Sequence, residues 1–237
     1  SLENTLSGGG SDVSLSTMMN VVVTGANKGI GLELARQYVA RGGEVLALCR
    51  EASPELCALK AEIVEGFDVT DLSALARLQT QLENGSIDIL IHNAGIRTFE
   101  TIADLDLDRI RHQFEVNAIA PLSMTHALRG KLANKAKVVL ISTRAASIGD
   151  NGSGGEYGYR MSKAALNMAG SNLAIDLRKD GVSVFMLHPG FVRTDLTDGE
   201  GMVSAAESAA KLVALTDRLT IHETGGFFHA DGDRLPW

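Results

Sequence analysis

The stretch VVVTGANKGIGLELARQYVARG, residues 21–42, places a run of valines directly before a glycine-rich turn and an amphipathic helical pattern. A buried strand, a tight turn and a helix start are expected in that order. Glycines let a ligand approach the backbone of the turn, and the free N–H groups at the helix start favour an anion. The spacing T-G-x-x-x-G-x-G differs from the G-x-G-x-x-G motif of other dinucleotide-binding folds and from the phosphate-binding loop of nucleoside triphosphatases. It predicts a turn that binds a pyrophosphate.

Apolar runs alternate with helical patterns along the rest of the chain. Strands are expected at 20–24, 44–49, 63–67, 87–92, 136–142 and 182–188, with a weak seventh near 226–229. Helices are expected near 29–41, 54–61, 71–83, 105–129, 156–180 and 204–216. The alternation predicts the α/β class, with a single Rossmann-type doubly wound parallel sheet of about seven strands and helices on both faces. Ligands of such a sheet bind beyond the carboxyl ends of its strands.

The composition is that of one globular domain. The chain has 237 residues, and we expect a single domain over residues 18–237. Residues 1–17 are polar, contain Gly-Gly-Gly and are interpreted as a leader or disordered tail. A net charge of −7 argues against a nucleic-acid partner, and no apolar run is long enough to span a membrane. Cys49 and Cys57 form no metal-ligand pattern, so we expect no metal site and a cytoplasmic location.

Tyr159 and Lys163 lie four residues apart in EYGYRMSKAALNMA and therefore project from one helical face. A lone Y-x-x-x-K is frequent by chance and is often only a surface pair. Here it follows both the glycine turn and the HNAG segment at 92–95. The spacing of Tyr159 and Lys163 becomes informative because of these two preceding motifs.

Together, TGANKGIG, FDVTD, HNAG, FEVNAIAP, LIST, YRMSK and HPGFVRTD resemble the classical short-chain dehydrogenase/reductase family, over essentially all of residues 20–237. Within that family, LHPGFVRTD and GGFFHADGDRLPW are similar to C-factor-like and sniffer-like carbonyl reductases. The resemblance implies an NAD(P)H-dependent oxidoreductase that reduces a small aldehyde, ketone or quinone by hydride transfer. The partner would be a small-molecule carbonyl or alcohol.

The resemblance implies four catalytic residues, namely Asn117, Thr143, Tyr159 and Lys163. Tyr159 would be the general acid, and the charge of Lys163 would favour its phenolate. The backbone of Asn117 would hold a water that links Lys163 to solvent, although a buried structural Asn is a fair alternative.

The hydroxyl that polarises the carbonyl is open between neighbours. The family commonly uses the second Ser of a Ser-Ser pair after the fifth strand, and this chain has Ser142-Thr143 there. By strand register Thr143 takes the working position and Ser142 points the other way. Ser142 and the more distant Ser147 remain alternatives.

The resemblance also implies a cofactor site. Its residues are Gly25, Asn27, Lys28, Gly29, Ile30, Arg50, Asp68, Val69, Asn93, Ala94, Gly95, Tyr159, Lys163, Pro189, Val192 and Thr194. Three of these assignments have structural alternatives. Asn93 would instead brace the strands, Asp68 would cap the turn before the third helix, and the Pro189 segment would be a plain turn.

The cofactor is expected to be NADP(H) rather than NAD(H). NAD-specific members carry an acid at the end of the second strand, where this chain has Cys49 followed by Arg50. Arg50 and Lys28 would bracket the 2′-phosphate through charge-assisted hydrogen bonds. The alternative is that both are solvated surface cations.

The substrate pocket and the assembly are less defined by the sequence. Arg97, Phe99, Arg144, Tyr157 and Phe191 follow motif positions and are candidates for lining the pocket, and the glycine-rich stretch after Thr194 suggests a mobile lid.

A homodimer or homotetramer through helices 105–129 and 156–180 is expected, with a monomer as the alternative. A competing function is an NADP(H)-binding sensor or signalling protein with little turnover. A methyltransferase has no use for Y-x-x-x-K, and an epimerase needs a larger carboxyl-terminal domain.

Overall fold

The computed structural model describes residues 18–237, so the expected leader lies outside the described part of the chain. Seven parallel strands form one sheet in the order β3-β2-β1-β4-β5-β6-β7. The strands are β1 Asn20–Thr24, β2 Glu44–Leu48, β3 Glu62–Val64, β4 Ile87–His92, β5 Leu132–Ile141, β6 Ser183–His188 and β7 Phe227–His229. The predicted α/β fold with a seven-stranded Rossmann-type sheet is confirmed.

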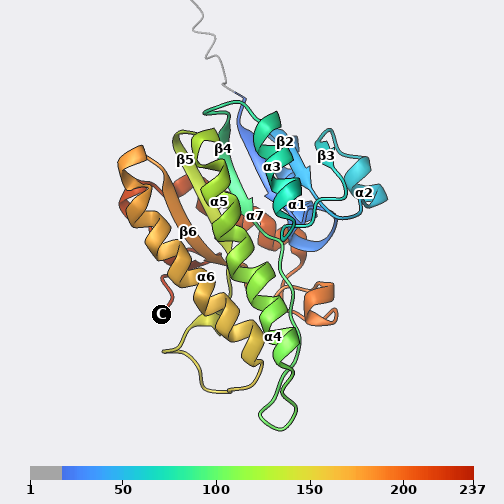
Figure 1. Ribbon diagram of the computed structural model, residues 1–237, viewed down its shortest axis with the longest axis vertical. Coiled ribbons are helices and arrows are strands. Elements are labelled where there is room, and N and C mark those ends of the chain that lie inside the picture. The colour runs from blue at the N-terminus through green and yellow to red at the C-terminus, as the bar shows by residue number, and fades with distance from the viewer. Residues whose placement is uncertain (1–17) are drawn as a thin grey trace, which may run out of the picture.

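Helices cover both faces of the sheet (Figure 1). They are α1 Gly29–Ala40, α2 Pro54–Cys57, α3 Leu72–Gln81, α4 Leu107–Phe114, α5 Ala120–Leu128, α6 Tyr157–Asp176 and α7 Ala205–Arg218. Tyr38 of α1 and Leu212 of α7 belong to the hydrophobic cluster on one face. Met124 of α5 and Leu166 of α6 belong to the cluster on the other face.

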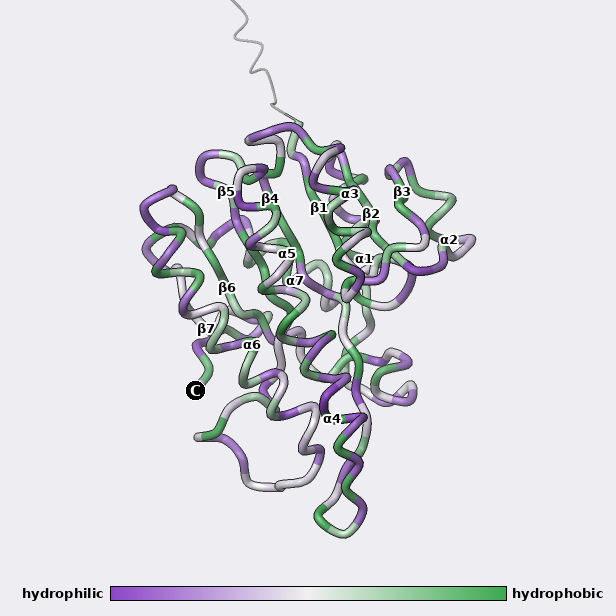
Figure 2. The backbone as a smooth tube through the Cα atoms, in the orientation of Figure 1, coloured by the Kyte–Doolittle hydropathy of each residue, from purple (hydrophilic) through white to green (hydrophobic). Residues whose placement is uncertain are grey.

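The strands are apolar along their length because both of their faces are buried. In β1, Val21 and Val23 enter one cluster while Val22 enters the other, as the alternation of a strand requires. The hydrophobic segments accordingly gather in the strands at the centre of Figure 2. Burial on both faces explains the absence of a polar-apolar alternation in the sequence.

One predicted helix is interrupted. The pattern over 105–129 suggested a continuous helix, but α4 and α5 are separated by a π-helical turn at Glu115–Ile119. Pro121 has no N–H, so the carbonyl of Asn117 lacks its ordinary partner four residues later. The Ala120 N–H instead bonds to the Glu115 carbonyl, five residues back. The sequence pattern missed this because the apolar spacing barely changes across a single wide turn.

Other boundaries also differ from the prediction. β5 begins four residues early at Leu132, β3 ends at Val64, and α2 ends after one turn at Cys57. Gly66 has a φ of 72°, which turns the chain out of β3 before residue 67. α6 ends at Asp176 and is followed by a tighter turn at Arg178–Asp180.

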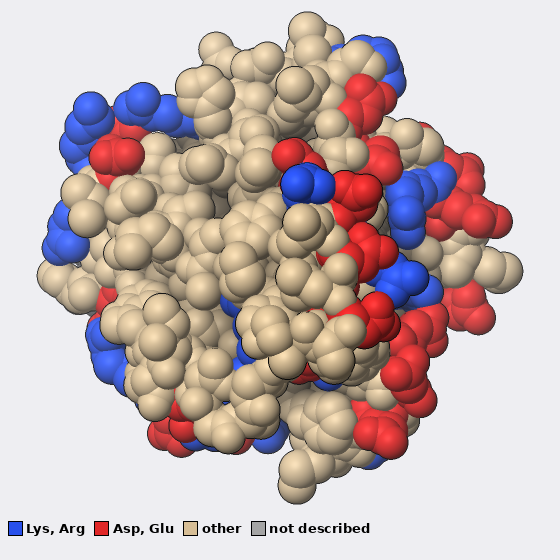
Figure 3. Space-filling model, turned by 60° about the horizontal axis from the view of Figure 1, so that its bottom comes forward, with Lys and Arg blue, Asp and Glu red and all other residues tan. Residues whose placement is uncertain are grey.

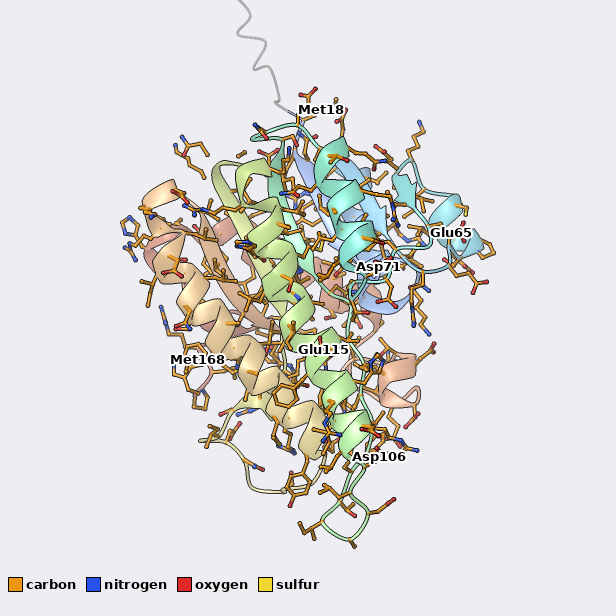
Figure 4. The ribbon with its side chains drawn as sticks, in the orientation of Figure 1. Met18, Glu65, Asp71, Asp106, Glu115 and Met168 are labelled. Carbon is orange, nitrogen blue, oxygen red and sulfur yellow. The ribbon has the colours of Figure 1, made fainter. Side chains whose placement is uncertain are left out.

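The carboxyl ends of the strands gather on one side of the molecule. Met18, which precedes β1, lies at the top of Figure 4, so β1 runs downward in this view. The strand order reverses between β1 and β4, where adjacent strands lead to helices on opposite faces. A crevice for a ligand is expected at that point of the sheet.

Candidate active site

The glycine turn after β1 has the backbone geometry that only glycine adopts easily. Gly25 and Gly29 have φ values of 65° and 55°. A Cβ at Gly31 would lie 2.2 Å from the Gly25 carbonyl oxygen. Lys28 is the N-cap of α1 in an extended conformation and makes no side-chain cap bond. The first N–H groups of α1 are therefore left for an anion, and the cradle that a Cβ would fill fits a pyrophosphate.

Asn93 fastens this turn to β4. Its side-chain amide donates to the carbonyl oxygens of Thr24 and Gly25, at 3.1 Å each. The Thr24 hydroxyl in turn accepts from the backbone N–H groups of Asn93 and Ala94, at 3.0 Å each. This bracing corresponds to the structural alternative for Asn93, and it holds Ala94 against Gly25 at the floor of the crevice.

Tyr159 and Lys163 project from one face of α6 and are both buried, with exposed fractions of 8% and 4%. The Lys163 ammonium donates to the Ile141 carbonyl at 2.8 Å. Burial lowers the pKa of Lys163 to about 8. Burial raises the pKa of Tyr159, while a side-chain hydrogen bond with Thr143 and the charge of Arg97 act to lower it. The two residues therefore form a buried pair rather than a surface pair.

Ser142 and Thr143 face different partners at the end of β5. The Ser142 hydroxyl donates to the side-chain oxygen of Asn167 at 2.6 Å, within the buried layer under α6. Thr143 is partly exposed and caps the following turn by accepting from the Ala145 N–H at 3.2 Å, and its side chain acts to lower the pKa of Tyr159. The hydroxyl beside the Tyr159 phenol is thus that of Thr143. Ser147 is held elsewhere, by the Trp237 carbonyl at 3.2 Å.

Asn117 lies in the π-helical turn and is completely buried. Its side-chain amide donates to the Ile96 carbonyl and to the Ser162 hydroxyl, at 2.9 Å each, and its oxygen accepts from the Ile96 N–H at 2.9 Å. A Cβ at Gly95 would lie 3.3 Å from the Asn117 oxygen and 3.4 Å from the Lys163 nitrogen. Gly95 therefore lets Asn117 and Lys163 come together beneath the crevice.

The two cations expected to bind the 2′-phosphate of the cofactor, Arg50 and Lys28, follow β2 and β1. Arg50 lies two residues after the end of β2 and is exposed. Lys28 is also exposed, and it forms an ion pair with Asp195 at 2.6 Å. Asp68 accepts from the Thr70 N–H and hydroxyl at 2.8 and 2.7 Å, which holds the pKa of its carboxyl below the usual range. Asp68 thus does shape the turn before α3, as its structural alternative proposed.

The segment after β6 folds back over the glycine turn. The Pro189 carbonyl accepts from the Ser208 hydroxyl at 2.7 Å, and Val192 pairs with Val203. The Thr194 side chain lies where a Cβ at Gly29 would meet it, at 3.4 Å. The segment expected to form a lid therefore begins against the predicted pyrophosphate position.

The remaining cofactor candidates support the turn from outside. The Asn27 carbonyl accepts from the Ser53 hydroxyl at 2.6 Å. Ile30 and Val69 are partly buried against the two hydrophobic clusters on opposite faces of the sheet.

Three residues at the site escaped the sequence-based assignment. Gly31 belonged to the quoted motif, but only the close approach of the Gly25 carbonyl shows why it must be glycine. Glu156 pairs with Arg97, and Asp195 pairs with Lys28. Neither contact has a local sequence signal, because the partners are separated by 59 and 167 residues.

The sequence pattern that defines "short chain dehydrogenase" matches residues 19–202. The chain belongs to the short-chain dehydrogenase family. A 1-hydroxy-2-glutathionyl-2-methyl-3-butene dehydrogenase of Rhodococcus sp. (strain AD45) is 42% identical over 226 residues, which is 93% of this chain and 100% of that protein. C-signal of Myxococcus xanthus is 36% identical over 161 residues, 67% of this chain and 97% of that protein.

Solved members of the family have the same fold. NADPH-bound carbonyl reductase from chicken fatty liver has a TM-score of 0.83 and 29% identity, covering 93% of this chain and 99% of that one. Carbonyl reductase Sniffer of D. melanogaster has a TM-score of 0.85 and 24% identity, covering 93% and 100%. The expected resemblance to C-factor-like and sniffer-like proteins is confirmed, and the short-chain dehydrogenase described here is an oxidoreductase.

The surface on the site's side of the molecule is not basic. Figure 3 brings the carboxyl ends of the strands forward and shows acidic side chains gathered along the right, Lys and Arg side chains along the left margin, and a largely uncharged middle. Within residues 18–237, no group of three His, Cys, Asp or Glu side chains is placed to hold a metal ion. No helix in this described range has the length and apolarity needed to cross a membrane.

Proposed function

We propose that this short-chain dehydrogenase reduces a small carbonyl compound with NADPH, using Tyr159 as the general acid. The observation that carries the proposal is the buried pair of Tyr159 and Lys163, with the partly exposed Thr143 beside Tyr159 and a glycine turn shaped for a pyrophosphate nearby. The carbonyl oxygen would lie against the hydroxyls of Thr143 and Tyr159.

The chain's own residues supply binding, orientation and the proton. When bound, NADPH supplies the hydride that adds to the carbonyl carbon. Thr143 donates a hydrogen bond to the carbonyl oxygen as negative charge grows on it. Tyr159 gives its phenolic proton to that oxygen, and the buried Lys163 ammonium favours the phenolate that remains. The carbonyl of Asn117, left without an ordinary helical partner, would hold a water that returns a proton to Lys163.

NADPH rather than NADH is favoured by the charges near the end of β2. Arg50 is exposed there, and the preceding position holds Cys49 rather than an acidic residue. Lys28 lies in the glycine turn. The chicken relative is NADPH-bound. Lys28 must leave Asp195 to reach a 2′-phosphate, so Arg50 would make the larger contribution.

One relative suggests a further class of substrate to test. The Rhodococcus protein is named for an alcohol that carries a glutathione thioether on the next carbon. We propose that small aldehydes, ketones and quinones be tested together with 2-thioether alcohols and their oxidised forms, since the same tyrosine serves either direction.

A second candidate is an NADP(H)-binding signalling protein with little turnover. The similarity to C-signal favours it. The presence of Thr143 beside the buried pair of Tyr159 and Lys163 argues against it, because nucleotide binding alone needs no positioned phenol.

The test combines binding and turnover. NADPH and NADH are titrated against wild type and Tyr159→Phe, and NADPH absorbance is followed over the substrate panel. Turnover that Tyr159→Phe abolishes while NADPH still binds supports the reductase. NADPH binding without turnover on any substrate would favour the signalling candidate, and failure to bind either nucleotide would overturn both.

We also propose that the protein forms a dimer or tetramer through the outer faces of α5 and α6. The exposed apolar side chains there are Leu122, Met161, Met168 and Ile175, with Ile119 in the π-helical turn directly before α5. Met168 projects from the outer side of α6 in Figure 4. A concentration-independent monomer mass in ultracentrifugation would contradict this.

Cys49 and Cys57 are unpaired, which supports a reducing, cytoplasmic location.

A further inference from the structure

Arg97, in the loop after β4, lies between two aromatic rings. Its guanidinium carbon is 4.5 Å from the centre of the Phe99 ring and 5.5 Å from the centre of the Tyr159 ring. A guanidinium within about 6 Å of a ring centre is attracted to the negative face of the ring. The attraction increases when the ring is a phenolate, because the ring then carries a full negative charge.

Glu156 holds Arg97 in this place through an unusual backbone. It is the N-cap of α6 and has φ 49° and ψ 44°, a left-handed conformation that residues other than glycine rarely adopt. Its N–H donates to the Glu100 carbonyl at 2.9 Å, and its carboxylate accepts from the Arg97 Nε at 2.7 Å. The Arg97 and Glu156 side chains are only 21% and 19% exposed. A partly buried ion pair is therefore fixed beside the proposed general acid.

We propose that Arg97 and Glu156 are positioning residues that set the proton affinity of Tyr159, with Arg97 stabilising the phenolate and Glu156 limiting that stabilisation. The inference rests on the proposed function, in which Tyr159 donates the proton. Their effects on Tyr159 have opposite signs, because one side chain is a cation and the other an anion.

Arg97 differs from Lys163 in the permanence of its charge. Lys163 is buried and has its pKa lowered to about 8, so it loses its charge over the range in which enzymes are commonly assayed. An arginine stays protonated in proteins. Arg97 therefore keeps a positive charge near the phenol at pH values where Lys163 has become neutral.

The other charged groups near Tyr159 do not replace Arg97 or Glu156 in these roles. The pKa of Tyr159 is raised by burial, lowered by Thr143 and by Arg97, and raised by Glu156. Glu100 is occupied by Thr98, by Gln113 and by the Gly158 N–H. Arg160 lies on the far oxygen of Glu156, at 3.9 Å, and adds no second cation over the ring among the contacts recorded for the described residues.

The test titrates Tyr159 directly by tyrosinate absorbance, which needs neither substrate nor turnover. The chain has three tyrosines, and burial raises the pKa of Tyr38 far above its usual value. Subtracting the titration of Tyr159→Phe removes Tyr38 and Tyr157 and leaves the Tyr159 signal. The variants are Arg97→Gln, Glu156→Gln and Arg97→Lys. The control is Arg129→Gln, which removes one cation from an ion pair with Asp180 at the other end of α5.

We expect Arg97→Gln to raise the Tyr159 midpoint and Glu156→Gln to lower it, each by about one pH unit. Arg97→Lys keeps the charge and should return the midpoint towards wild type, and Arg129→Gln should leave it unchanged. Circular dichroism at each pH checks that the protein is folded. Shifts of the same sign in Arg97→Gln and Glu156→Gln, or no shift in either, would overturn the inference. Because the readout is an absorbance, an inactive wild type would count against the proposed reductase and leave this result standing.

Discussion

Ser142 donates its hydroxyl hydrogen to the side-chain oxygen of Asn167 at 2.6 Å, and both side chains are buried between β5 and α6. The neighbouring Thr143 is directed instead to Tyr159. Adjacent residues of an extended strand point to opposite sides, so only one of the two hydroxyls can reach a substrate held against Tyr159.

Thr143→Val should therefore lower kcat by at least about 100-fold, since it removes the hydroxyl next to the developing alkoxide. Thr143→Ser keeps the hydroxyl and should retain most of the activity. Ser142→Ala is the matched control. It should keep kcat within a few-fold and lower the free energy of unfolding by about 1–2 kcal/mol, because Asn167 loses its partner. Equal losses of kcat in Ser142→Ala and Thr143→Val would contradict the assignment.

Arg50→Asp should weaken NADPH binding by about 10- to 100-fold and leave NADH binding unchanged or improved. The reason is that a carboxylate at the end of β2 repels a 2′-phosphate and accepts from a 2′-hydroxyl. Isothermal titration with both nucleotides measures the ratio. Arg178→Asp makes the same charge change on an exposed arginine after α6 and should alter neither affinity. The proposal fails if Arg50→Asp changes the affinity for neither nucleotide.

Gly31→Ala should abolish NADPH binding. The added methyl would lie 2.2 Å from the Gly25 carbonyl oxygen of the turn and 2.4 Å from the Asn93 amide nitrogen that holds the turn to β4. Alanine ordinarily favours a helix over glycine, so a loss here would come from the close approach. Gly130→Ala adds the same methyl where nothing lies within 4 Å and should bind NADPH normally. Normal binding by Gly31→Ala would show that the turn can widen.

Acid should destabilise the fold through His92. This side chain is buried, with its Nε2 2.9 Å from the Thr125 hydroxyl, and burial lowers its pKa to about 3 from 6.5. The unfolded chain takes up the proton first as the pH falls. The contribution of His92 is therefore fully present above pH 6.5 and is lost below it, at about 1.4 kcal/mol per pH unit, until the folded state also protonates near pH 3.

Denaturant unfolding on either side of pH 6.5 measures this slope. Below pH 6.5 the free energy of unfolding of His92→Asn should fall less steeply with pH than that of wild type, by the slope that one proton contributes. The control is His126→Asn on the exposed side of α5, which should have the same slope as wild type. If wild type and His92→Asn lose stability in parallel, then His92 is not the residue that protonates on unfolding.

Local patterns in the sequence were enough to predict the order of the elements. Unbroken apolar runs such as VVLIS predict strands covered on both faces, and β4, β5 and β6 lie near their predicted positions. The pairing of Tyr159 with Lys163 followed from their spacing on one helical turn. The break between α4 and α5 was readable in principle, because Pro121 removes one N–H, but apolar periodicity does not register it.

The sequence by itself determined the parallel sheet, the glycine turn and the helical face that carries Tyr159 and Lys163, because each depends on residues within a few positions of one another. Only the tertiary structure decided which charges meet. Arg97 with Glu156 and Lys28 with Asp195 are each joined across many residues of chain by the packing of loops at one edge of the sheet. The burial that lowers the pKa of Lys163 to about 8 likewise comes from the packing of α6 on the sheet, which no local pattern encodes.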